Sequence, residues 1–532
     1  MIDVLIKNGT VIDGTGAEAE KADIAIKDGR IVRIAANITD DSLRVIDAGG
    51  QYVSPGFVDS HCHTDTYAAF VPDAEAKLMQ GVTTDVCGLC GECQAPVGAG
   101  HLKEYRERMP YQIKGAPELM PRTFQDYMDQ INRQGNTTNM AAFVGNSALR
   151  IAAAGYEDRR LTAKEMDVMK GMLKESMEAG AFGLSTGLTY VPSCFADTEE
   201  LIELSRAMAP YGGIYNSHMR NESDQILDSI REVIEIAEKS GCRGHVSHLK
   251  VTGKKNHGRA EECLELIHRA NERGVPVTFD VYPYTAGSCS FKTLLPPAML
   301  EKGVENFSDI TSRKELLKEL KEGLRRSDWD NMYLNYGADA IRVSAACGLE
   351  EYEGHTLSEI AEKKGISHEE AILLVLQETR GQASMIYEAA CETDLKIFMK
   401  DPLCMLGTDA FARKYTGFTA EGKPHPRNYG AFPRYLEHYI LMEKLLPVEE
   451  AVRKMTALPA EVFGLGNRGI LREGAAAEIT VWDPAAIRET GSYMEPWKQP
   501  QGISCVLVGG ELAVDDGVFC DIRRGRMLKK EQ

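Results

Sequence analysis

Apolar and polar residues alternate at both ends of the chain, and glycine turns separate the apolar runs. The first 56 residues contain "VLIKNGTVIDGTG", "ADIAIKDGRIVRIA" and "LRVIDAGGQYVSPG", and the C-terminal part contains "AAEITVWDP" and "ISCVLVGGELAVDDG". A period of two with Asn-Gly and Asp-Gly turns is typical of β-hairpins. We therefore expect residues 1–54 and 467–532 to build one small β-sandwich from both chain ends.

Between these ends, short apolar strands alternate with amphipathic helical segments such as "DQILDSIREVIEIAEKSG" and "AEECLELIHRANERG". This alternation predicts parallel βα units. Eight strands follow in order: "YVSPGFVDSH", "GVTTDVCG", "NMAAFVGN", "GAFGLSTG", "GGIYNSH", "RGHVSH", "VPVTFDVYPY" and "CMLGTDA". Eight is the count of a (β/α)8 barrel, which we place at residues 55–466. The segment 288–345 is too long for a simple connection between a strand and a helix. Its length predicts a small insertion after the seventh strand.

Composition and charge limit the classes of function. The chain has 61 basic and 79 acidic residues, and this excess of acid argues against a nucleic-acid partner. No apolar run reaches the roughly 18 residues needed to span a bilayer, and the start lacks the pattern of a signal peptide. The 13 cysteines are scattered, which indicates reduced thiols. We expect a cytoplasmic enzyme with a small-molecule substrate and neither a nucleic-acid nor a membrane partner; the oligomeric state is not predicted.

Candidate chemistry gathers where the predicted barrel strands end. In a parallel barrel these carboxyl ends meet at one face. The first strand ends on His61 and His63, which share one face while Cys62 points away. The second strand runs into two cysteines. The fifth strand ends on His218, the sixth on His248 and the eighth on Asp409. Imidazole, thiolate and carboxylate are donors that zinc accepts, so the sequence predicts a metal site.

The stretch "DVCGLCGECQAP" holds Cys87, Cys90 and Cys93 at equal spacing. C-x-x-C-x-x-C also begins iron–sulfur clusters and some zinc knuckles, but no nearby Cys-Pro motif offers a fourth ligand for a cluster. The residues alone do not decide which thiol binds a metal.

Motifs throughout the chain resemble one family. They include "PGFVDSHCHTD", "GLSTGLTYVP", "GGIYNSHMRNE", "VSHLK", "FDVYPYTAGS", "HPRNYGAFPRYL" and "AVRKMTALPAEVFGL". Together they resemble the amidohydrolase superfamily and, within it, the N-acyl-D-amino-acid deacylases, or D-aminoacylases. The resemblance implies a zinc-bearing barrel, a β-sandwich from both chain ends and an insertion after strand seven.

The resemblance also implies roles for the candidate residues. Cys90, in "GLCG", and His218 match the ligands of a tightly held zinc, and Cys87 and Cys93 have no counterpart. His61, His63 and His248 match the ligands of a second, weaker metal position. Asp409 matches the catalytic aspartate, which also touches metal. The family usually has Ser-Asp-Gly here, whereas this chain has Thr408 and Ala410, and it has Asn146 where the family commonly has Gly-His.

The implied reaction is zinc-dependent hydrolysis of N-acyl-D-amino acids to a carboxylate and a free D-amino acid. Asp409 would act as general base and then general acid, with metal-activated water as the nucleophile. Arg427 matches the position that binds the substrate carboxylate, and Lys250, Tyr282 and Ser288 match further substrate contacts. The basic loop 411–426 is long and is consistent either with a contact to a second substrate carboxylate or with an exposed lid.

Two alternatives remain. A cyclic amidohydrolase, such as a dihydroorotase or hydantoinase, usually carries a carboxylated lysine at the end of strand four, but "GLSTGL" has no lysine. A non-catalytic scaffold of the superfamily would have lost metal ligands, and this chain keeps them.

Overall fold

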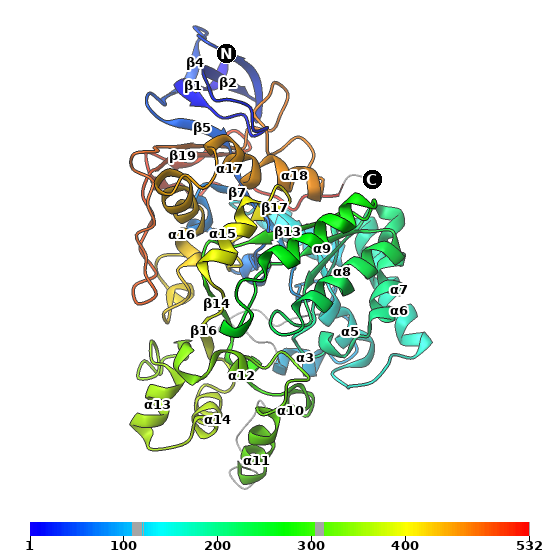
Figure 1. Cartoon of the computed structure of the whole chain (residues 1–532). Helices are drawn as coiled ribbons and strands as arrows, with labels where there is room; N and C mark the ends of the chain where they lie inside the picture. The colour runs from blue at the N-terminus through cyan, green and yellow to red at the C-terminus, as the bar shows by residue number, and fades with distance from the viewer. Residues whose placement is uncertain (109–119, 121, 304–312, 531–532) are drawn as a thin grey trace.

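A computed structural model describes residues 1–108, 120, 122–303 and 313–530. Its centre is a barrel of eight parallel strands whose residues are almost all buried (Figure 1). The barrel strands are β6 (Phe57–Asp59), β7 (Val82–Cys87), β8 (Asn139–Ala142) continued by β9 (Val144–Gly145), β10 (Gly183–Gly187), β11 (Ile214–His218), β12 (Arg243–Val246), β13 (Val277–Val281) and β17 (Cys404–Leu406). The amide of Ser60 donates to the carbonyl of Leu406 at 3.2 Å, which joins the first strand to the last. The predicted barrel is therefore confirmed.

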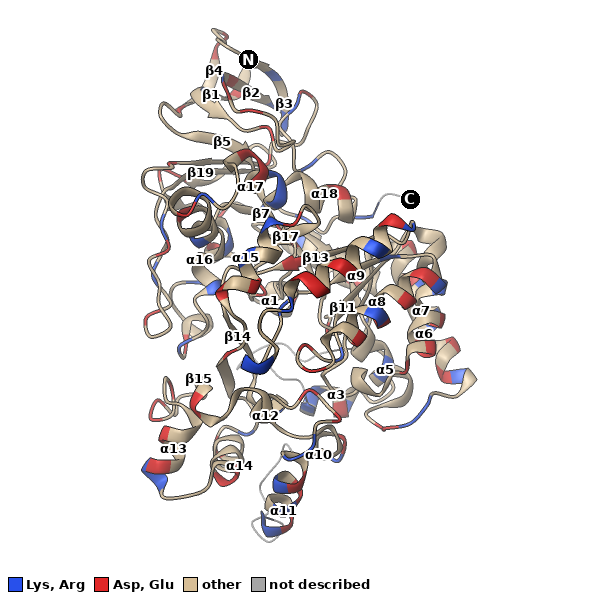
Figure 2. Ribbon diagram, in the orientation of Figure 1, with Lys and Arg blue, Asp and Glu red and all other residues tan. Residues whose placement is uncertain are grey.

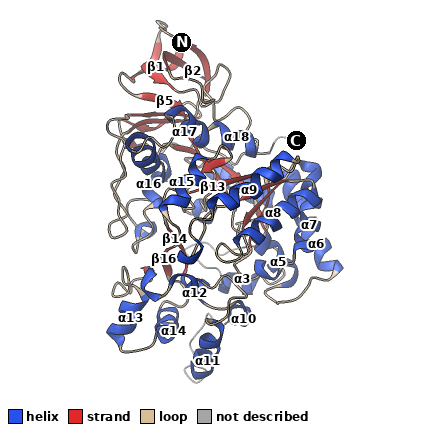
Figure 3. Cartoon of the chain, viewed as in Figure 1, coloured by secondary structure: helices blue, strands red, loops and turns tan. Residues whose placement is uncertain are grey.

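Helices surround this barrel (Figure 3). Those between and after the barrel strands are α1 (Asp65–Ala68), α2 (Glu75–Leu78), α3 (Leu102–Arg108), α4 (Phe124–Gln134), α5 (Asn146–Ala154), α6 (Ala163–Ala179), α7 (Thr198–Met208), α8 (Ile226–Ser240), α9 (Ala260–Glu272), α15 (Glu392–Lys400), α16 (Arg427–Arg434), α17 (Val448–Met455) and α18 (Ala457–Phe463). Helix α8 buries Ile230, Val233 and Ala237 at helical spacing, so one apolar stripe faces the strands. Helices α6–α9 carry many acidic and basic residues (Figure 2). Among the described residues, no helix is both long and apolar enough to cross a bilayer.

Both chain ends form one nine-stranded sheet. Its strands are β1 (Ile2–Val11), β2 (Glu20–Lys27), β3 (Arg30–Ala35), β4 (Ser42–Asp47), β5 (Tyr52–Pro55), β18 (Ile479–Trp482), β19 (Ile503–Val508), β20 (Glu511–Asp515) and β21 (Val518–Phe519). Antiparallel pairing of Val53 with Val481 joins the two ends. At the β2–β3 turn, Asp28 and Gly29 have φ of 49° and 71°, as a tight hairpin turn requires.

The insertion after β13 carries its own three-stranded sheet and apolar core. Its elements are β14 (Ala286–Ser290), α10 (Pro297–Glu301), α11 (Arg313–Gly323), α12 (Met332–Tyr336), β15 (Ile341–Ala345), α13 (Leu357–Lys364), α14 (His368–Glu378) and β16 (Ser384–Glu388). Strand β16 pairs with both β14 and β15, so the segment continues past the predicted end at residue 345. The buried cluster extends from Cys289 to Ala389. We propose 286–390 as its limits, and the outer boundaries at 54–55 and 466–467 also stay a proposal.

A buried lysine holds together the first, second and last barrel strands. Lys77 donates to Asp59, donates to the Thr408 hydroxyl at 2.8 Å and lies 3.7 Å from Asp85. The Thr408 hydroxyl in turn donates to Asp59 at 2.6 Å. The threonine that departs from the family pattern therefore keeps a hydroxyl contact that fixes the loop before Asp409.

Lys77→Met is expected to lower the free energy of unfolding by about 3–5 kcal/mol, because it leaves two buried carboxylates without their cation. Lys454→Met is the matched control, since Lys454 is equally buried but donates only to the carbonyls of Asp401 and Cys404. Denaturant unfolding measures both variants. An equal loss of unfolding free energy in the two variants would contradict the stabilising role of the Lys77 charge.

Asp330 fastens the insertion to the barrel. Its carboxylate accepts from Ser223 Oγ at 3.2 Å and from Asn335 Nδ2 at 3.1 Å. Burial, helped by the nearby Glu222 carboxylate, raises the pKa of Asp330 to about 7. In the unfolded chain an aspartate ionises near pH ~3.9. Between these values the folded state holds the extra proton, so stability falls as pH rises.

Asp330→Asn should therefore have the same melting temperature as the wild type near pH 4. Above pH 7 its melting temperature should be higher than that of the wild type. The amide cannot ionise, yet its oxygen still accepts both hydrogen bonds. Thermal melts at the two pH values measure the difference, with Asp328→Asn, an exposed neighbour, as control. An equal shift at both pH values would rule out the assigned ionisation.

Candidate metal centre

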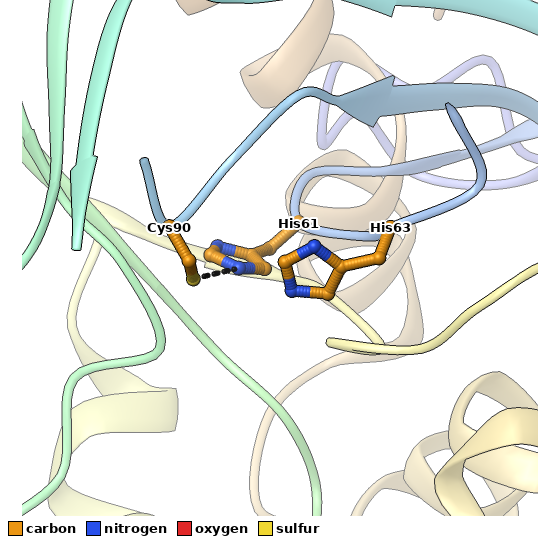
Figure 4. Close-up of side chains that lie close together, drawn as sticks. All are labelled: His61, His63 and Cys90. Atoms are coloured by element: carbon orange, nitrogen blue, oxygen red, sulfur yellow. Dashed lines mark hydrogen bonds between the residues drawn. The ribbon is translucent and has the colours of Figure 1, made fainter. Parts of the chain in front are cut away.

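Two groups of donor atoms meet at the carboxyl ends of the barrel strands. In the first, one ligand atom each of His61, His63 and Cys90 lies within 4.8 Å of the others (Figure 4). In the second, Cys90, His218 and His248 meet the same limit. Cys90 Sγ lies 3.4 Å from His61 Nε2 and 3.5 Å from His248 Nε2. The thiol is therefore common to both groups.

The second βα loop holds Cys90 in an unusual conformation. Cys90 has a φ of 53°, in the left-handed region that non-glycine residues seldom adopt. Its carbonyl lies against the end of β10, where a Cβ on Gly187 would come within 2.1 Å of it. The loop therefore occupies the end of strand four and leaves no room there for a lysine side chain. His248 and Asp409 also have positive φ, 34° and 50°, and such conformations cluster at functional sites.

The other cysteines of the motif lie apart from these groups. Cys87 is buried within β7, which is the place expected of a residue that packs in the core. Cys93 Sγ accepts a hydrogen bond from the amide of Gly145 at 3.1 Å. Cys62 Sγ lies 3.6 Å from Asp85 and so on the opposite side from His61 and His63. Within the described residues, neither Cys87 nor Cys93 belongs to a group of potential metal ligands.

Asp409 lies beside the first group. Its Oδ1 is 3.1 Å from His63 Nε2 and 3.8 Å from His61 Nε2. Its Oδ2 is 2.9 Å from Arg427 Nη1. Burial raises the pKa of Asp409, but the Arg427 guanidinium and His63 outweigh burial and hold the pKa well below its usual range. The carboxylate is therefore ionised at neutral pH.

Two buried carboxylates, Asp280 and Glu222, lie beside the histidines of the site. Asp280 Oδ1 is 3.4 Å from His61 Nδ1, and Asp280 Oδ2 accepts from the amide of His248 at 3.1 Å. Glu222 Oε1 is 3.1 Å from His248 Nδ1. In the sequence, an acidic residue inside the predicted strand "VTFDV" could have pointed to a role for Asp280 at the site. Glu222 does not pair with its neighbour Arg220, which bonds Glu232 instead at 2.8 Å.

The predicted substrate contacts surround the same site. Lys250 Nζ bonds Glu222 at 2.8 Å, and Arg427 Nη2 donates to the carbonyl of Ser288 at 3.1 Å. The ring of Tyr282 lies under both cations, 4.8 Å from the Arg427 guanidinium and 5.7 Å from Lys250 Nζ. The buried hydroxyl of Tyr282 has no hydrogen-bond partner among the described residues. The structure thus brings all four residues together.

A cavity of about 170 Å³ opens onto this site. It is lined by His63, Cys90, His218, His248, Asp409 and Arg427 at one end and by Tyr105, Ile151, Tyr156, Leu300, Trp329 and Met332 elsewhere. Lys250, Lys292 and Arg108 also line it. A cavity with apolar walls and a few polar groups is typical of a small-molecule site.

The basic residues of loop 411–426 bond to other parts of the chain in this structure. Arg413 donates to Asn428 at 3.1 Å, Lys414 bonds Asp73, and Lys423 donates to the carbonyl of Glu353 at 3.1 Å. None of the three basic side chains lines the cavity.

Asn146 departs from the family pattern and also lies outside the cavity lining, where its Oδ1 accepts from Ser193 Oγ at 2.7 Å. The departure therefore leaves the donor groups described above intact.

The donor set fits a divalent metal of intermediate softness such as zinc. One thiol, imidazoles and a carboxylate are its usual ligands. Both ring nitrogens of His218 are buried and have no hydrogen-bond partner in the described part of the chain, although a buried imidazole normally finds one. Burial keeps the pKa of His218 well below its usual value, so the ring is neutral, as a ligand must be. Burial raises the pKa of the Cys90 thiol, and an adjacent cation reverses this effect.

Comparison with known proteins gives full-length matches. A family model described as "Amidohydrolase family" matches residues 44–514. The chain is 33% identical to a D-aminoacylase of Alcaligenes xylosoxydans xylosoxydans over 529 residues, 99% of this chain and 98% of that protein. It is also 33% identical to an N-acyl-D-glutamate deacylase of the same organism over 535 residues, 100% of this chain and 97% of that protein.

A solved structure shows the same architecture. The N-acyl-D-glutamate deacylase from Bordetella bronchiseptica, complexed with zinc and a phosphonate inhibitor that mimics the tetrahedral intermediate, is similar with a TM-score of 0.81 and 32% identity. The match covers 99% of each chain. Sequence resemblance and three-dimensional similarity therefore agree over the whole molecule.

Proposed function

Because the chain belongs to the amidohydrolase family, we propose that it is a zinc-dependent hydrolase that cleaves N-acyl-D-amino acids to a carboxylate and a free D-amino acid. The observation that carries the proposal is the thiol of Cys90, which lies within 3.5 Å of imidazole nitrogens from both donor groups. The full-length similarity to D-aminoacylase and N-acyl-D-glutamate deacylase supports the substrate class.

In the proposed centre, Cys90 and His218 would hold the tightly bound zinc, and His61, His63 and His248 would provide a second, weaker position. A bound zinc ion would polarise the amide carbonyl and lower the pKa of water to about 7. Asp409 would take a proton from the attacking water and return it to the departing nitrogen, as its ionised state and its place beside His63 allow. This return matters because an amide nitrogen leaves poorly without a proton.

Arg427 is the proposed partner of the substrate's α-carboxylate, since a guanidinium binds a carboxylate with two parallel hydrogen bonds. Lys250, Tyr282 and Ser288 would complete this contact, because they surround Arg427 beside the cavity. Lys292 also lines the cavity and adds positive charge that a second carboxylate could use.

The cyclic-amidohydrolase alternative is less well supported. Strand β10 has no lysine, and the Cys90 loop fills the space at its end. A scaffold without activity is also less well supported, because the imidazoles and the thiol expected from strands one, two, five and six fall into two groups of potential metal ligands. A cytoplasmic location is proposed on the thirteen cysteines, all in the described part of the chain and all unpaired.

The test is a panel of N-acetyl and N-formyl amino acids of both hands, with hydantoin and dihydroorotate, scored by amine release or ring opening. The D-enantiomers are expected to be hydrolysed, and the panel should include glutamate and aspartate derivatives. Turnover of L-substrates alone, or of cyclic substrates alone, would overturn the proposal.

A further inference from the structure

A single oxygen of Glu222 lies between a proposed metal ligand and a proposed substrate-binding cation. Glu222 Oε1 is 3.1 Å from His248 Nδ1 and 2.8 Å from Lys250 Nζ. Lys250 Nζ is also 2.9 Å from the same His248 Nδ1. All three side chains are buried. Two neighbours, one acceptor and one donor, therefore compete for one ring nitrogen.

The outcome of this competition decides whether His248 can bind a cation. A neutral imidazole carries its proton on one nitrogen and a lone pair on the other. With the proton on Nδ1, the ring donates to Glu222, and the Nε2 lone pair faces Cys90 Sγ at 3.5 Å. If Lys250 donates to Nδ1 instead, Nε2 must carry the proton, and its lone pair is lost to the metal.

We propose that Glu222 is a positioning residue that selects the metal-binding tautomer of His248 by accepting the Nδ1 proton, in competition with Lys250 Nζ, which lies 2.9 Å from the same nitrogen. The inference rests on the proposed metal centre. The carboxylate accepts from both donors at once, and Lys250 also donates to the carbonyl of His248 at 3.1 Å, so the ammonium is satisfied without Nδ1. One side chain thereby sets the geometry of both the metal ligand and the substrate cation.

The test is the zinc affinity of the metal-free protein, measured by competition with a chromophoric chelator. Glu222→Ala should weaken binding at the second, weaker zinc position, to which His248 belongs, roughly 10–100-fold, the usual cost of losing the partner of a metal-bound histidine. Lys250→Met should bind zinc at least as tightly as the wild type, because it removes only the competing donor. The double variant Glu222→Ala/Lys250→Met should recover most of the affinity lost in Glu222→Ala.

Glu200→Ala is the matched control. Glu200 is also a buried carboxylate with a basic partner, Arg150 at 2.6 Å, but it lies outside both donor groups. Its removal should leave zinc affinity unchanged, which separates loss of a buried charge from loss of tautomer control.

A double variant as weak as Glu222→Ala, or weaker, would overturn the proposal, because a merely structural role gives losses that add. A tenfold weaker affinity in Lys250→Met would overturn it too, and this single variant decides the matter even if Glu222→Ala does not fold. A wild-type chain that binds no zinc would instead refute the proposed metal centre itself.

Discussion

Cys90→Ala should lose the tightly held zinc and, with it, nearly all activity. Cys90 is the one residue shared by the two donor groups, and its sulfur lies within 3.5 Å of His61 and His248 nitrogens. Loss of an outer partner typically lowers metal affinity by ~10–100-fold. Loss of a shared ligand should lower it by more than about 100-fold, leaving less than about 1% of wild-type turnover. Metal analysis of purified protein and chelator competition measure the effect.

Cys93→Ala is the control for this substitution. It makes the same chemical change three residues away, where the sulfur only accepts a bond from Gly145. Its zinc content should match the wild type. Full zinc in Cys90→Ala, or loss of zinc in Cys93→Ala, would show that the wrong thiol was assigned.

Asp409→Asn is expected to keep its zinc and to lower kcat by roughly 10²–10⁴-fold, the usual contribution of a general acid–base group. The amide oxygen can still accept from His63, while the amide nitrogen replaces the oxygen that lies 2.9 Å from Arg427 Nη1. The amide cannot take a proton from water. Steady-state kinetics together with zinc analysis separates the two effects.

Asp401→Asn provides the comparison, since Asp401 is a buried carboxylate just before β17 that bonds His268 at 2.6 Å and does not line the cavity. Its kcat per folded molecule should stay near the wild-type value. A parallel loss of zinc and activity in Asp409→Asn would instead assign Asp409 mainly to metal binding.

The local sequence pattern was sufficient for the barrel and for most of its donors. Short, mostly apolar runs bounded by turns predicted strands such as Val277–Val281, because strands buried on both faces are rich in apolar residues. Thr278 and Asp280 are the buried polar exceptions in this strand. The ends of parallel strands share one face, so His218 and His248 could be brought together from sequence alone. The eight strands and the donor-bearing ends were therefore predictable without coordinates.

Contacts between loops were not predictable in this way. Arg220 and Glu222 are close in sequence, yet they bond different partners, Glu232 and Lys250. The basic residues of 411–426 suggested a substrate contact, yet Lys414 bonds Asp73. Loop side chains follow no fixed period, so neighbours in sequence can point to opposite sides.

The sequence by itself determined which elements form and which residues stand at the strand ends, because hydrophobic periodicity is a local property of the chain. Only the tertiary structure decided that the left-handed turn at Cys90 brings its sulfur to both histidine groups. It also decided that the carboxylates of Asp280 and Glu222 lie beside the rings of His61 and His248. These contacts join residues far apart in the chain, and their geometry follows from how the closed barrel packs its loops.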